Sequence, residues 1–208
     1  GKLKNNQNTI GVNYKHIWNN RAYTNTSISN SIKQSDAHFL NINSGQTVFN
    51  IVENTNVKNI RQVNHLKLGP ASKMEFGFDT EINDTDYNYY RKLPESSVFV
   101  NEIQFDRLVS TVNYSAFITL KKNLFSRLIF SAGMRLDQND YEKVNLISPR
   151  MNLDYELVRG KTNLIINSGL YHQNPPAIYI ANNASKKLKS VKALQHSISL
   201  EHMLTPST

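Results

Sequence analysis

Charged side chains recur at every second position of several segments, and they are the residues best suited to polar chemistry. Side chains two positions apart point to the same face of a β-strand. Charges gathered on one face of a sheet can line an aqueous interior or contact a second domain that the sheet encloses. Arg135 and Asp137 could pair there. The candidates for this interior-facing role are Glu75, Gly77, Asp79, Arg135, Asp137 and Asp154.

Three glycines, Gly77, Gly133 and Gly169, fall inside predicted strands. A missing side chain there lets a neighbouring residue or an enclosed domain approach the backbone closely. A strand bend that eases the curvature of a barrel is an equally good explanation. The sequence leaves both open.

Tyrosines near two predicted strand ends form a second candidate set. Tyr87, Tyr89 and Tyr90 lie close together, and Tyr171 begins a second segment that runs to Tyr179. Tyrosine is rigid and amphipathic, which suits binding surfaces. We therefore predict ligand contact at Tyr87, Tyr89, Tyr90 and Tyr171, with ordinary loop packing as the alternative.

The remaining residue types do not indicate an enzyme. The chain has no cysteine, and its six histidines show no ligand spacing supported by a carboxylate, so we expect no metal site and no cofactor. Neither a nucleophile elbow nor a phosphate-binding loop is present. The formal charge is +8, but lysine and arginine are spread along the chain, so we expect no nucleic-acid partner.

The elements that must position these residues are strands of about 9 to 11 residues, since apolar and polar residues alternate with period two. Short turns are predicted near 19–21, 69–72, 121–124 and 159–161. Long loops are predicted near 33–57, 83–108, 138–149 and 174–190. Tight turns alternating with long loops are typical of outer-membrane barrels.

No apolar run is long enough for a membrane helix, and the mean hydropathy of −0.49 is low. Low hydropathy is compatible with a membrane barrel, in which every second strand residue faces lipid. About nine strands with unclosed edges indicate a piece of something larger. The predicted fold is all-β, with antiparallel up-and-down strands over residues 1–208 that form an arc of a transmembrane β-barrel.

Five segments also resemble TonB-dependent outer-membrane receptors, in the order found in that family. Met74–Phe78 resembles a "lefGfe" strand, Phe130–Asp137 the "aGlRyD" strand, and Ile147–Leu153 the "SPRlsl" segment. Ser168–Pro176 is similar to "yGryyqaPp", and Leu200–Pro206 to "lEhxltp".

This resemblance implies a location in the bacterial outer membrane, within a plugged barrel of twenty-two strands. The implied function is uptake of a scarce nutrient such as a siderophore, vitamin or glycan. The implied partners are membrane lipid and lipopolysaccharide, a small-molecule or oligomeric nutrient, and TonB acting through a plug region. The resemblance covers the wall alone, so we expect no plug domain within residues 1–208.

Two other functions remain open at this point. One is a soluble β-sheet module that binds glycan or protein through its polar face. The other is a porin-like structural barrel without TonB coupling. Burial separates the first from a membrane wall, since Phe76, Phe78, Phe130, Met134 and Leu153 would pack against a second sheet in a soluble module but face outward in a wall.

Overall fold

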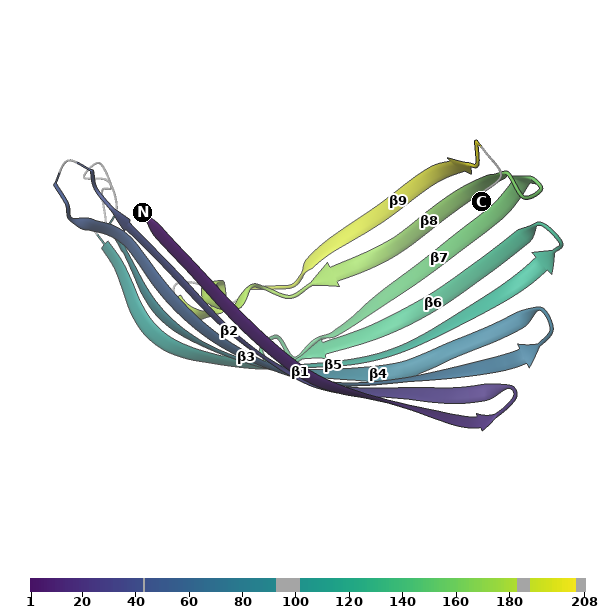
Figure 1. Ribbon diagram of the computed structural model, residues 1–208, viewed down its shortest axis with the longest axis horizontal. Helices are drawn as coiled ribbons and strands as arrows, with labels where there is room; N and C mark the ends of the chain where they lie inside the picture. Colours follow the sequence, from purple (N-terminus) through teal and green to yellow (C-terminus); the bar gives the residue numbers. More distant parts are fainter. Residues whose placement is uncertain (43, 93–101, 183–187, 205–208) are drawn as a thin grey trace.

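The structure is a computed structural model that describes residues 1–42, 44–92, 102–182 and 188–204. These residues form one open, curved sheet of nine strands in sequential order, with every neighbouring pair antiparallel (Figure 1). The predicted all-β class and up-and-down topology are confirmed. The elements are β1 (Lys2–Asn19), β2 (Ala22–Leu40), β3 (Thr47–Gly69), β4 (Ser72–Lys92), β5 (Glu102–Phe125), β6 (Leu128–Asn139), β7 (Asn145–Val158), β8 (Thr162–Gln173), α1 (Ala177–Ala181) and β9 (Val191–His202).

The helix α1 identifies the concave side of the sheet. It lies inside the curve in Figure 1, and its Ala181 packs against Tyr87 and Val109. Every second residue of a strand shares a face, so Glu81 and Asp79 lie on the concave side with Tyr87. Phe76 and Phe78 therefore lie on the convex side.

The convex side carries an apolar band that narrows on β3 to Leu66 and Ile60, because Asn64 and Gln62 face Phe76 and Phe78 there. The cross-strand register aligns Phe76 with Ile118, and Ile118 with Met134. Ile118 is 49% exposed, and Ile198 on β9 is 75% exposed. Among the described residues, the buried apolar set consists of Tyr87, Val109 and Ala181. The described residues therefore form a single layer, without a dry core between two sheets.

No helix among the described residues has the length and apolar character needed to cross a membrane.

Two predicted loops are wrong. The stretches 33–57 and 83–108 consist largely of strand, because β2 continues to Leu40, β3 begins at Thr47, β4 continues to Lys92 and β5 begins at Glu102. The predicted turn near 121–124 is also misplaced, since β5 runs to Phe125 and β6 starts at Leu128. The connection near 138–149 shortens to residues 140–144, and that at 174–190 contains α1.

Physically, these extensions form because β2 to β5 exchange the polarity of their faces beyond the apolar band. On the concave face the rings of Phe39, Phe49, Tyr89 and Phe105 follow one another across four strands, with centroid separations of 5.8, 5.7 and 4.8 Å. The opposite face there carries exposed polar residues such as Asp86. Beyond the apolar band, the paired strands are therefore stabilised by apolar side chains that pack on the concave face.

Candidate functional site on the concave face

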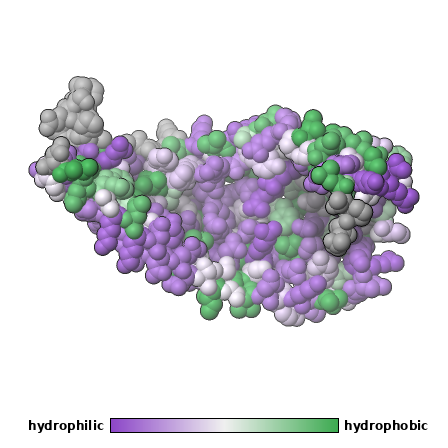
Figure 2. Space-filling view, turned by 45° about the horizontal axis from the view of Figure 1, so that its top comes forward, coloured by the Kyte–Doolittle hydropathy of each residue, from purple (hydrophilic) through white to green (hydrophobic). Residues whose placement is uncertain are grey.

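All six predicted interior-facing residues lie on the concave face. Glu75, Gly77 and Asp79 come from β4, Arg135 and Asp137 from β6, and Asp154 from β7. The space-filling view shows a hollow in the middle of the sheet lined largely by hydrophilic residues (Figure 2). The structure brings Asp79, Arg135 and Asp137 together. It leaves Asp154 without an ion pair or side-chain hydrogen bond to any described residue.

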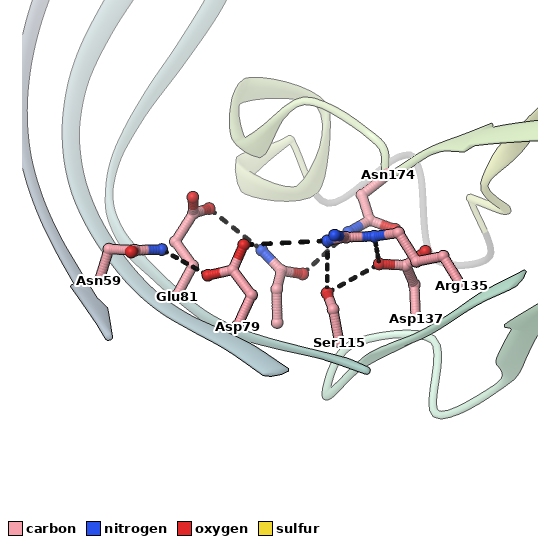
Figure 3. Close-up of polar contacts among 8 residues, drawn as sticks. Asn59, Asp79, Glu81, Ser115, Arg135, Asp137 and Asn174 are labelled. Carbon is pink, nitrogen blue, oxygen red and sulfur yellow. Dashed lines mark hydrogen bonds and ion pairs between the residues drawn. The ribbon is translucent and has the colours of Figure 1, made fainter. Parts of the chain in front are cut away.

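Arg135 is the centre of the polar contacts on this face (Figure 3). Its Nε donates to Asp137 Oδ1 at 2.7 Å, and its second guanidinium nitrogen donates to Ser115 Oγ at 2.7 Å. Ser115 Oγ in turn donates to Asp137 Oδ1 at 2.7 Å, and Asp79 Oδ2 lies 4.0 Å from the guanidinium. These charge-assisted contacts link side chains of β4, β5 and β6 across the concave face.

Asn113 extends these contacts to the β8–α1 connection. Its Oδ1 accepts hydrogen bonds from Asn139 Nδ2 at 2.7 Å and from Asn174 Nδ2 at 2.8 Å, while its Nδ2 donates to Glu81. Sequence reasoning missed this residue, because Asn113 and Asn174 are 61 positions apart and no local pattern joins them. A segment that follows β8 is thereby tied to the middle of the concave face.

A cleft of about 380 Å³ lies on the same face, toward β6 to β8. Three cations line it, Arg61, Arg135 and Arg150, together with Glu75 and Tyr171. The Arg150 guanidinium lies 4.5 Å from the ring centroid of Tyr171. Such a cation-lined cleft suits an anionic or oxygen-rich group.

At the three strand glycines, a neighbouring residue lies so close to the backbone that a side chain would collide with it. A Cβ on Gly77 would collide with the carbonyl oxygen of Gln62 and lie 3.1 Å from the ring of Phe117. At Gly133 it would meet Thr119 Oγ1 at 2.8 Å. At Gly169 the Tyr171 ring and the Arg150 stem occupy the space. Each glycine therefore accommodates a neighbour of the same sheet.

The tyrosines lie on strands rather than in loops. Tyr87 is 4% exposed beneath α1, and burial together with Glu53 raises the pKa of Tyr87 to about 12. Tyr89 stacks on Phe105, Tyr90 falls on the opposite face, and Tyr171 lines the cleft. Of the four, Tyr89 and Tyr171 are thus the ones placed on the concave face with some of their surface free.

Within the described ranges, no group of three or more histidine, aspartate or glutamate side chains is close enough to hold a metal ion.

Comparison with solved structures shows which β-sheet proteins have the same arrangement of strands. Neither a protein-family model nor a curated protein matches the sequence. The copper transporter OprC matches with a TM-score of 0.70 at 13% identity, over 95% of this chain and 36% of that one. BauA, the ferric preacinetobactin receptor from Acinetobacter baumannii, matches with a TM-score of 0.65 at 11% identity, over 97% and 36%. The ferric citrate transporter FecA, unliganded, matches with a TM-score of 0.62 at 14% identity, over 96% and 32%.

The chain has the fold of part of the barrel of TonB-dependent receptors.

The resemblance stated from the sequence is confirmed at the level of fold. The chain spans about a third of the length of the TonB-dependent receptor structures that it matches. These structural neighbours are transporters and receptors rather than enzymes.

Proposed function

We propose that this chain forms part of the barrel wall of an outer-membrane TonB-dependent receptor that takes up a scarce nutrient. The observation that carries the proposal is the single sheet with an exposed apolar convex band and a polar concave face. The wall does not itself catalyse a reaction and needs no cofactor. Its open edges, β1 and β9, would pair with further strands, because lipid cannot satisfy unpaired backbone groups.

The height of the apolar band supports this proposal. On β4 the alternation from Met74 to Ile82 covers nine residues, and on β5 it covers 112–120. Nine residues make about 30 Å of strand, and a tilt of about 40° reduces this to roughly 23 Å, close to the apolar height of an outer-membrane barrel. The convex partners would be membrane lipid and lipopolysaccharide.

The concave face supports a receptor role. Tyr89 and Tyr171 are the proposed ligand contacts, and the cleft with Arg61, Arg135 and Arg150 would face a plug domain or the nutrient. The nutrient would be a siderophore, vitamin or glycan, and TonB would act through the plug region. Copper, ferric citrate and ferric preacinetobactin are the ligands named for the three matched proteins.

Single cysteines test the proposed location, since the chain contains no cysteine of its own. Ser44→Cys lies in the β2–β3 connection and Arg159→Cys in the tight β7–β8 turn, at opposite ends of the sheet. In intact cells, a membrane-impermeant maleimide should label Ser44→Cys but label Arg159→Cys only after the outer membrane is opened. Equal labelling of both in intact cells would contradict the proposal.

Energy coupling needs a separate measurement. Growth on limiting iron, copper, cobalamin or glycan should depend on the protein and be lost when TonB is depleted. Growth that depends on the protein but not on TonB would favour the porin-like alternative.

A further inference from the structure

Four cations form one row across the concave face near the tight-turn end of the sheet. Lys67 on β3 is the direct cross-strand partner of Lys73 on β4, and Lys73 is the partner of Lys121 on β5. The backbone nitrogen of Lys67 donates to the carbonyl of Arg21, which adds a fourth cation at the β1–β2 turn. All four line one cleft of about 240 Å³.

Within the described ranges, none of the four cations in this row forms an ion pair. None of the four cations lies within 4.0 Å of a carboxylate oxygen in that part of the chain. Glu75 is the one acid lining the cleft, and its carboxylate lies 3.3 Å from His65 Nδ1 instead. Like charges directly opposite each other destabilise a sheet, so the row is unfavourable until an anion joins it.

We propose that this row binds an acidic, extended polypeptide segment that enters the barrel from the tight-turn end. The proposal rests on the proposed barrel, because the row faces an enclosed space only when the sheet closes. Four positions on adjacent strands span about 14 Å, which matches several residues of extended chain and exceeds a single phosphate or carboxylate.

Two further observations favour a polypeptide over a lipid headgroup. Lys67, Lys73 and Lys121 share the concave face with Glu75, whereas bilayer lipid would contact the convex face. The cleft walls also include Tyr23, whose ring stacks on His65 at 4.3 Å, so the site offers apolar contact between its charges. Acidic side chains separated by apolar ones fit this surface.

A photo-crosslinker at Ser131 tests the proposal in the complete protein in its own membrane. Ser131 is the cross-strand partner of Lys121 and lines the same cleft. After irradiation, mass spectrometry should identify a crosslinked peptide rich in aspartate and glutamate, from the same protein or from a partner. Replacing Lys67, Lys73 and Lys121 together by glutamine should lower the yield about tenfold, the combined effect of three exposed ion pairs.

Lys122→Gln is the matched control, because Lys122 follows Lys121 on β5 but points to the convex face. It should leave the yield unchanged. Crosslinks to phospholipid, lipopolysaccharide or a segment without acidic excess would overturn the proposal. So would an unchanged yield in the triple variant, or no crosslink at all. Surface labelling of Ser44→Cys, added to each variant, reports the fold and location separately, so that failure of the proposed barrel is distinguishable from failure of the lysine row.

Discussion

At Gly77 the backbone of β4 passes so close to its neighbours that a side chain has no room. Gly77→Ala places a methyl group against the Gln62 carbonyl and the Phe117 ring. We expect the free energy of unfolding to fall by about 1–3 kcal/mol, the usual effect of overpacking. The urea midpoint of the protein refolded into lipid vesicles measures this change.

Gly69→Ala is the control for that substitution. Gly69 has nothing within 4 Å of an added Cβ, and it is not among the glycines with positive φ. Its unfolding free energy should change by no more than about 0.5 kcal/mol. If both variants lose stability equally, the loss comes from the strand backbone rather than from the close approach at Gly77.

Among the elements, the paired outer halves of β2 and β3 give a direct test of register. Ser35 faces Glu53, and Asp36 faces Val52. Successive antiparallel pairs alternate between wide and narrow Cα separations, so at least one of these two pairs should form a disulfide when both members are replaced by cysteine. Non-reducing peptide mapping would detect it.

The out-of-register pair Ser35→Cys with Val57→Cys is the matched comparison. Val57 faces Ser31, four residues from Ser35, which separates the two by about 13 Å along the strand. This pair should stay reduced. Efficient oxidation of the mismatched pair would mean that this region is a loop, as the sequence predicted.

The short helix α1 should detach when its buried contact becomes charged. Ala181 is 1% exposed against Tyr87 and Val109, so Ala181→Glu would force a larger, charged side chain into a contact that has no room for it. We expect faster hydrogen exchange in α1 and around Val109. Tyr179→Glu, at a position that is 58% exposed, should leave both protected to the original degree.

The sequence predicted a strand best where the apolar residues stay on the same face along its whole length. From Met74 to Ile82 the alternation is regular, and β4 contains that segment. On β3 the phase changes, because Ile60 falls on the convex face and Val57 on the concave face, so the alternation reads as an irregular loop. The five-residue helix α1 is too short for a helical period, and the Asn113–Asn174 contact has no local signature.

For the whole molecule, the decisive property is that opposite faces of the same strand tolerate different residues. Ile28 is 55% exposed within the convex band, and the next residue, Ser29, faces the concave side opposite Gly11. Ile28→Arg should destabilise the protein in a bilayer by about 2–4 kcal/mol if it lies near the midplane.

Ser29→Arg, at the same depth, should change stability by less than about 1 kcal/mol, since lumen-facing positions tolerate charge. The pair is compared by urea unfolding in vesicles. Equal losses at the two positions would argue against a lipid-facing convex side.

The strands differ greatly in length, with 24 residues in β5 and 12 in each of β6, β8 and β9. If this sheet is part of a barrel wall, the wall has unequal height at the end opposite the tight turns. Strands β1 to β5 extend further there than β6 to β9 (Figure 1). A solute that crosses the rim above the shorter strands β6 to β9 would then meet the aromatic rings of Phe39, Phe49, Tyr89 and Phe105 on the concave face of the longer strands. Antibodies or phage would find most of their accessible protein on the convex face of the extended parts of β2 to β5.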